Sequence, residues 1–319
     1  MSLKTLIREL SKKNKMLSRQ YAKLTWYKSK LNAIFESDRH FAIRTYKKKF
    51  GKVLNLDNPC TFDEKLWWLK LNNRAPLLTI CSDKYLVREY VRGCDLGHIL
   101  NELYGVYDDA REIDFDSLPD EVFFKCNHTS GINRIYDKNV FFDKEDFIQR
   151  FNFVLKQNYY TKSREWNYKN IKPLIICERV LKQSDGTLPI VDYKFLCFAG
   201  EPKLLLYETG LCKDNGEHAG KGNRKVLDMN FMPVDIKFIT IEPFGEAEAE
   251  KPVNLNQMVE YAKIISKPFP ICRVDLYNID GSIFFGEITF YPWGGYNNIH
   301  PEEWATILGD WIDIYYGRK

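Results

Sequence analysis

Two carboxylates, an arginine and a hydroxyl group alternate along one short segment near the end of this chain. They are Arg273, Asp275, Glu287 and Thr289, within ICRVDLYNIDGSIFFGEITFYPWGG at 271–295. Runs of β-branched, aromatic and aliphatic residues flank Asn278-Ile279-Asp280-Gly281. That pattern predicts a β-hairpin.

The length of the hairpin loop decides which side chains share a face. A three-residue loop closed by left-handed Gly281 puts the odd-numbered residues of both strands, including the four polar ones, on one face. The other face is then apolar: Cys272, Val274, Leu276, Phe284, Ile288 and Phe290. A two-residue loop at Asp280-Gly281 would mix the two sets, which a half-buried strand pair resists. We therefore expect the three-residue loop.

Two neighbouring carboxylates repel each other unless a cation lies between them. Oxygen ligands suit Mg²⁺, which shares its coordination shell with substrate phosphates, and Arg273 suits a phosphoryl group or an oxyanion. A solvated hairpin face with an Arg–carboxylate pair explains the same pattern equally well on charge alone.

Other candidate binding groups lie earlier in the chain. Lys125 is in the middle of a predicted strand, where a charge must be paired or face a ligand. The small residues that follow, His128, Thr129, Ser130 and Gly131, can fold their backbone N–H groups over phosphates. A Walker A motif is absent from the sequence. An ordinary hairpin over 121–136 is an equally good interpretation of this segment.

Weaker signals accompany these. Lys84 lies on a helix predicted over 82–92, capped by Ser82 or Asp83. A buried strand over 173–181 ends in Glu178-Arg179-Val180-Leu181, and Asp192 and Lys194 open the strand DYKFLCF. The polar, glycine-rich stretch 208–233 predicts a functional loop or lid. Its Arg224 and Lys221 suit an acidic substrate as well as they suit solvent.

Composition excludes several classes of protein. The chain has 319 residues, 45% of them hydrophobic, and a net charge of +4, which is too small to indicate nucleic-acid binding. No apolar run reaches the roughly 18–20 residues that cross a bilayer. The eight cysteines form no C-x-x-C pair, which favours reduced thiols in a cytoplasmic protein.

The first 50 residues differ from the rest. They hold 14 Lys and Arg against three acids, and leucine recurs every seven residues at Leu3, Leu10, Leu17, Leu24 and Leu31. This pattern predicts a long basic helix. Through residues 1–36 it could form a homodimeric coiled coil or lie on an anionic membrane at its inner face. Packing on the body of the same chain is a third interpretation, which we favour less.

The hairpin motif, R-V-D followed by G-E-x-T and a Gly-rich exit, resembles the metal-binding hairpin of ATP-grasp ligases, whose pattern is R-x-D … E-x-N. The chain more narrowly resembles the TupA-like ATP-grasp family of teichuronopeptide biosynthesis, through the segments DKYxVREYV, FFKCNHTSG, DYKF and RVDLYNxxGxIxFGExT. The resemblance covers roughly residues 42–319. Thr289 stands where the ATP-grasp pattern has Asn.

The resemblance implies a role for each candidate residue. Asp275, Glu287 and Thr289 would hold Mg²⁺, while Arg273 and Lys194 would be catalytic. ATP would be bound by Lys84, Lys125, His128, Thr129, Ser130, Gly131, Glu178, Arg179, Leu181, Asp192 and Lys194. The implied fold is α+β: two α+β subdomains that clasp ATP, with a helical basic extension over 1–50. Residues 51–120 would form an N-terminal subdomain and 121–319 the nucleotide-binding subdomains.

The implied activity is that of an ADP-forming carboxylate–amine ligase. The expected substrates are a uronic-acid carboxylate of a bacterial surface polysaccharide, free or lipid-linked, and an amino acid or small amine. A metal-dependent glycosyltransferase, a non-catalytic nucleotide-binding scaffold and a peptide ligase acting on a free amino acid remain alternatives.

Overall fold

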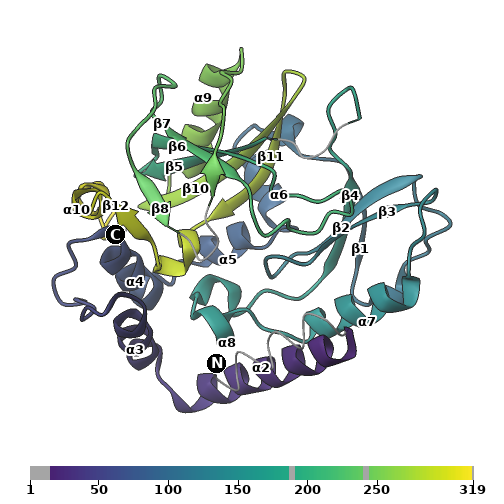
Figure 1. The fold of residues 1–319 in the computed structure, drawn as a ribbon, viewed down its shortest axis with the longest axis horizontal. Coiled ribbons are helices and arrows are strands. Elements are labelled where there is room, and N and C mark those ends of the chain that lie inside the picture. Colours follow the sequence, from purple (N-terminus) through teal and green to yellow (C-terminus); the bar gives the residue numbers. More distant parts are fainter. Residues whose placement is uncertain (1–14, 187–190, 240–243, 318–319) are drawn as a thin grey trace.

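The structure is a computed structural model that describes residues 15–186, 191–239 and 244–317. Figure 1 shows two mostly antiparallel sheets that stand apart, with helices around them. The helices are α2 (Lys15–Phe35), α3 (Asp38–Phe50), α4 (Phe62–Asn72), α5 (Pro76–Ser82), α6 (Val87–Gly93), α7 (Lys144–Leu155), α8 (Tyr160–Ser163), α9 (Leu255–Ser266) and α10 (Glu303–Asp310). No helix in the described ranges is long and apolar enough to cross a membrane.

The smaller sheet has four strands in the order β1-β4-β2-β3, all antiparallel. These are β1 (Leu103–Tyr107), β2 (Glu121–Cys126), β3 (Asn133–Asp137) and β4 (Ile175–Arg179). Alternation along β2 buries Val122 and Phe124 beneath α7, where they pack with Phe147 and Phe151. The same alternation turns Lys125 to the opposite face of the sheet. Strands β2 and β3 with the loop between them confirm the hairpin predicted over 121–136.

The larger sheet has six strands in the order β11-β10-β5-β6-β7-β9. They are β5 (Asp192–Phe198), β6 (Glu201–Thr209), β7 (Asn223–Leu227), β9 (Gly245–Glu246), β10 (Ile271–Ile279) and β11 (Ser282–Thr289). Helix α9 covers one face with its buried Leu255, Met258 and Ala262. Because side chains alternate along a strand, the charged residues of β5, β10 and β11 lie on the other face. A separate pair joins β8 (Lys237–Ile239) to β12 (Asn298–His300).

The predicted hairpin exists, but its loop has two residues and the three-residue prediction is wrong. Ile279 pairs with Ser282, and Asp280 and Gly281 have φ of 49° and 87°. Two left-handed residues form the turn that matches the twist of the flanking strands. With that loop Leu276 pairs with Phe285, so Phe285 is in the core and the prediction that Phe284 would be there is wrong.

A bulge at Gly286 restores the predicted polar face. The register shifts between Leu276 and Asp275, so that Asp275 lies opposite Glu287 and Arg273 opposite Thr289. An extra residue in one strand moves every later side chain to the other face. A Cβ at position 286 would lie 2.9 Å from the Asp275 carbonyl oxygen, so the bulge requires glycine.

Two predicted boundaries need correction. Helix α6 begins at Val87, because the Asp83 carboxylate accepts hydrogen bonds from the Tyr85 and Leu86 amides and holds a turn there first. The stretch 208–233 is not one loop, since β7 occupies part of it and pairs with β6.

The described part of the predicted N-terminal helix is α2, which continues after a bend at Ser37 into α3 (Figure 1). Trp26 packs edge-on against Phe153, and Arg19 contacts Gln149 of α7. Leu24 and Leu31, however, are 69% and 55% exposed. One face of α2 therefore packs on the body while part of the leucine stripe faces outward. Leu3 and Leu10 lie outside the described residues.

Candidate active site

A cavity of about 1020 Å³ lies between the two sheets. Its wall combines residues of β2 and β3 with residues of β5, β10 and β11. Lysine and arginine side chains outnumber acids on this wall: Lys48, Lys49, Lys84, Lys125, Lys194, Lys221, Arg224 and Arg273 face Asp192, Glu208, Asp275 and Glu287. Such a positive surplus favours a polyanionic ligand.

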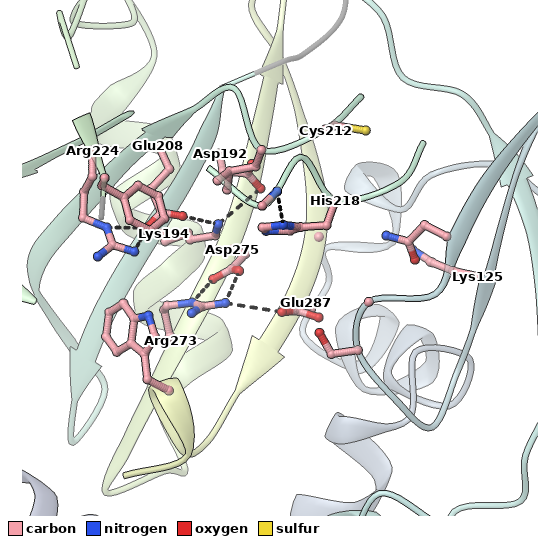
Figure 2. A pocket seen from close by; sticks show the side chains of 18 of the residues that line it. Lys125, Asp192, Lys194, Glu208, Cys212, His218, Arg224, Arg273, Asp275 and Glu287 are labelled. Atoms are coloured by element: carbon pink, nitrogen blue, oxygen red, sulfur yellow. Dashed lines mark hydrogen bonds and ion pairs between the residues drawn. The ribbon is translucent and has the colours of Figure 1, made fainter. Parts of the chain in front are cut away.

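The hairpin contributes the central cluster (Figure 2). The Arg273 guanidinium donates two hydrogen bonds of 2.6 Å to the Asp275 carboxylate and lies 3.3 Å from the Glu287 carboxylate. The Thr289 hydroxyl accepts a hydrogen bond from Arg273 at 3.1 Å and donates one to Glu287 at 3.2 Å. The four residues of the predicted polar face are thus joined in one network.

The two carboxylates of this cluster differ in environment. Asp275 is almost fully buried, and burial raises its pKa to about 7 even though Arg273 lowers it. Glu287 keeps 36% of its side chain exposed to the cavity. Burial would raise the pKa of Glu287, but the charges of Lys84 and Arg273 outweigh it and hold that pKa well below its usual range. Glu287 is therefore the accessible, ionised carboxylate of the pair.

Lys194 is fixed by acids on neighbouring strands. Its ammonium lies 2.5 Å from Glu208 and 3.7 Å from Asp192. Burial opposes its charge, but these carboxylates raise the pKa of Lys194 overall. Glu208 also accepts a 2.5 Å hydrogen bond from Arg224, whose guanidinium carbon lies 3.7 Å from the centre of the Phe244 ring and 5.0 Å from that of Trp293. Both cations therefore remain charged within the cavity wall.

On the opposite wall, Lys84 is held by the segment that follows β2, whereas Lys125 lies on β2 itself. The Lys84 amide donates to Asn127 O at 3.2 Å, and its ammonium donates to Thr129 O at 3.1 Å and lies 3.4 Å from Glu287. Lys84 thus joins the loop between β2 and β3 to the hairpin. The Lys125 ammonium lies 2.7 Å from Glu178. Figure 2 shows Lys125 across the cavity from Arg224.

The structure does not bring every predicted residue to this wall. His128 is 2% exposed, and its Nε2 lies 3.1 Å from Val154 O, away from the cavity. Arg179 is exposed and lies over the ring of Phe284, outside the cavity lining. Leu181 and Thr129 are also outside the lining, whereas Ser130 and Gly131 are part of it. Glu178 does not line the cavity itself, but it forms an ion pair with Lys125, which does.

Several lining residues were not identified from the sequence. Glu208 ends a buried strand, and only its partners on β5 and β7 reveal that it is a site residue. Trp293 and Tyr296 follow the hairpin, in a stretch whose sequence shows only a Gly-rich pattern. Lys48 and Lys49 are indistinguishable in the sequence from the other lysines of the basic extension. The sequence offers Arg224 as a cation for an acidic substrate, and the structure places it in the wall.

This two-sheet architecture with a cationic cavity is of the ATP-grasp class, α+β as the sequence predicts. The sequence model described as TupA-like ATPgrasp matches residues 64–313. The chain therefore belongs to the TupA-like ATP-grasp family. Comparison with curated proteins found no match.

Solved structures give more distant similarities. D-alanine–D-alanine ligase from Bacillus anthracis is 17% identical with a TM-score of 0.38, covering 67% of this chain and 59% of its own. L-amino acid ligase from Bacillus licheniformis is 12% identical with a TM-score of 0.45, covering 82% and 57%. The ATP-grasp ligase PsnB, in complex with minimal precursor, Mg and ADP, is 12% identical with a TM-score of 0.33, covering 71% and 57%. The chain spans less than two thirds of each.

Proposed function

We propose that this protein is an ATP- and Mg²⁺-dependent carboxylate–amine ligase that releases ADP. The observation that carries the proposal is the convergence of Lys84, Lys125, Lys194 and Arg273 on one cavity that also presents Asp275 and Glu287. Fixed cations beside two carboxylates suit a metal–triphosphate. Family membership supports the same activity.

The nucleotide would lie between the loop that joins β2 to β3 and the hairpin. The phosphates would be bound by Lys84, Lys125 and the amides of Ser130 and Gly131, all of which line the cavity. Asp192, also in the lining, would accept hydrogen bonds from the ribose hydroxyls. We propose that Glu178 acts by holding Lys125, which it contacts at 2.7 Å. Recognition of adenine by the segment Glu178–Leu181 remains a prediction from the resemblance to the family.

The residues of the hairpin fit Mg²⁺. Asp275 and Glu287 are cross-strand partners that supply hard oxygen ligands. Within the described ranges no group of three or more His, Cys, Asp or Glu could hold a metal by itself. Mg²⁺ commonly completes its coordination shell with phosphate oxygens and water. When bound, it would neutralise charge on the phosphates. Ligation by Thr289 stays a prediction.

The reaction would have two steps. A carboxylate oxygen of the acceptor attacks the γ-phosphorus, the bond from that phosphorus to the bridging oxygen breaks, and ADP leaves with the electron pair. An amine then attacks the acyl carbon, loses a proton, and phosphate leaves with the former carboxylate oxygen. Arg273 and Lys194 hold fixed positive charge beside the oxygens where negative charge develops. A closed cavity would also protect the acyl phosphate from water.

We propose a uronic-acid carboxylate of a surface polysaccharide, free or lipid-linked, as the acceptor and an amino acid or small amine as the nucleophile, in the cytoplasm. Residues 121–319 would supply the nucleotide-binding subdomains, 51–120 the N-terminal subdomain and 1–50 the basic extension. These assignments extend the resemblance to the family and the cationic character of the cavity wall.

Thermal unfolding with added nucleotides tests the proposal. Mg²⁺-ATP should raise the melting temperature, because a ligand that binds only the folded state stabilises it, whereas UDP-sugars should not. Lys125→Met should lose most of the shift, while Lys156→Met, outside the cavity lining, should keep it. Stabilisation by a UDP-sugar and not by ATP would reject the ligase in favour of a glycosyltransferase.

A further inference from the structure

One wall of the cavity comes from a helix that precedes the segment matched by the family. Thr45, Lys48 and Lys49 of α3 line the same cavity as Arg273 and Asp275, although the family match begins at residue 64. Three and four residues after Thr45, the two lysines lie one turn along on the same face of α3.

Helix α3 is a fixed part of the body. Its Ala42 and Tyr46 are 0% and 6% exposed and pack with Leu54, Leu56 and Trp67. At its first residue, the Asp38 carboxylate accepts hydrogen bonds from Tyr160 and Arg164. The Tyr296 hydroxyl contacts the Thr45 hydroxyl at 2.7 Å. The lysines of its last turn are therefore held at a set place relative to the site.

A chain of contacts places α3 on the side of the cavity away from Lys125. Figure 2 shows Arg224 and Lys125 on opposite sides, with Arg273 and Asp275 between them. Arg224 lies 5.0 Å from the Trp293 ring, Trp293 is followed closely by Tyr296, and Tyr296 contacts α3. The cavity therefore extends from the proposed phosphate site past Arg224 to the end of α3.

The last turn of α3 carries three lysines whose charges can attract an anion. Lys47, Lys48 and Lys49 are exposed and precede Gly51, whose amide ends the helix on Lys47 O. Over the part of the chain that the structure describes, no acidic side chain forms an ion pair with any of the three. Only Lys48 and Lys49 line the cavity; Lys47 does not.

We propose that Lys48 and Lys49 form a second anion subsite, so that the acceptor carries more than one negative charge. One carboxylate reacts near Arg273, and a further carboxylate of the same oligosaccharide is held at the end of α3. This inference rests on the proposed function, since it assumes that the cavity holds both nucleotide and acceptor. A neutral chain or a single uronate leaves the lysines unused.

Calorimetric titration of oligouronates tests the proposal. Full-length protein with Mg²⁺ and a non-hydrolysable ATP analogue is titrated with trigalacturonate, monomeric galacturonate and neutral maltotriose. We expect trigalacturonate to bind about tenfold more tightly than the monomer, the gain from two further charge contacts, and maltotriose not to bind. Lys48→Ala/Lys49→Ala should remove that ratio and leave binding of the monomer and the nucleotide unchanged.

The matched control is Lys47→Glu, which changes the net charge by the same amount on the same turn but outside the cavity. It should keep the tenfold ratio. An equal loss in Lys47→Glu would indicate a general field and overturn the subsite, as would a ratio near one in the unaltered protein. Phosphatidylglycerol vesicles, if bound through Lys48 and Lys49 without any preference for trigalacturonate, would assign the lysines to lipid headgroups instead. Failure of the nucleotide itself to bind would reject the proposed function separately.

Discussion

The pairing of Lys125 with Glu178 allows a prediction that separates a ligand-binding residue from one that positions it. Glu178 is 5% exposed and contacts two cations, Lys125 at 2.7 Å and Arg88 at 3.4 Å. Burial lowers the pKa of Arg88, and Glu178 partly restores it. The carboxylate therefore compensates two charges that the fold withdraws from water.

Replacing Glu178 with Gln would leave both cations without their carboxylate. Removing one partner of a buried pair costs about 3 kcal/mol or more, although Arg88 would keep its hydrogen bond to Asn101 O. For a chain of this size, a loss of about 3 kcal/mol lowers the melting temperature by roughly 4–5 °C. Lys125→Met leaves Glu178 paired with Arg88 and removes a side chain that is 18% exposed, so about 1 kcal/mol is expected.

The assay is urea-induced unfolding without nucleotide, followed by measurement of the dissociation constant for Mg²⁺-ATP. Lys125→Met should be nearly as stable as the unaltered protein and bind nucleotide at least tenfold more weakly. Glu178→Gln should be much less stable and also bind more weakly, because Lys125 is no longer held in place. A Glu178→Gln protein of unchanged stability would refute the reasoning from burial. Full nucleotide affinity in Lys125→Met would remove Lys125 from the site.

Three further predictions follow from other parts of the molecule. Glu287→Gln should abolish ADP release and leave the fold intact, because over a third of the Glu287 side chain is exposed; near-normal ADP release would contradict a role for Glu287 in the reaction. Thr289→Asn should stay active. Burial raises the pKa of Asp63 to about 7, whereas its unfolded value is about 4. The contribution of Asp63 to the free energy of unfolding should therefore fall as the pH rises from about 4 to about 7. Asp63→Asn should gain stability relative to the unaltered protein between pH 5 and pH 8, and a constant difference would be evidence against this. Deleting residues 1–36 should reduce self-association or liposome binding, since Leu24 and Leu31 are exposed; loss of thermal stability alone would assign the helix to the body.

The alternation of residue types was enough to predict the polar face of the hairpin, but not the way in which the chain builds it. Because successive side chains of a half-buried strand alternate between its two faces, the pattern identifies four residues of one face as neighbours: Arg273, Asp275, Glu287 and Thr289. The actual loop at Asp280-Gly281 would have reversed this on β11, had a bulge at Gly286 not intervened. Gly286 and a neighbouring aromatic pair give no pattern that distinguishes a bulge from a regular strand.

Residues that reach the site through tertiary contacts could not be predicted from spacing. Glu208 is revealed only by Lys194 and Arg224 on the strands beside it. Lys48 depends on the contact of Thr45 with Tyr296, 251 residues away. Conversely, His128 lies within a convincing polar loop, yet its ring packs inward against Val154 O. A local pattern shows which residues are polar, whereas packing decides which way each one turns.

Transfer of oxygen from the acceptor to phosphate tests the central claim most directly. The protein is incubated with Mg²⁺-ATP, trigalacturonate labelled with ¹⁸O in its carboxylates, and hydroxylamine as the nucleophile. The proposed steps predict ADP, a hydroxamate, and phosphate that carries one ¹⁸O atom, because the acyl–oxygen bond breaks in the second step. Release of AMP with pyrophosphate, or of phosphate without the label, would contradict formation of an acyl phosphate at this site.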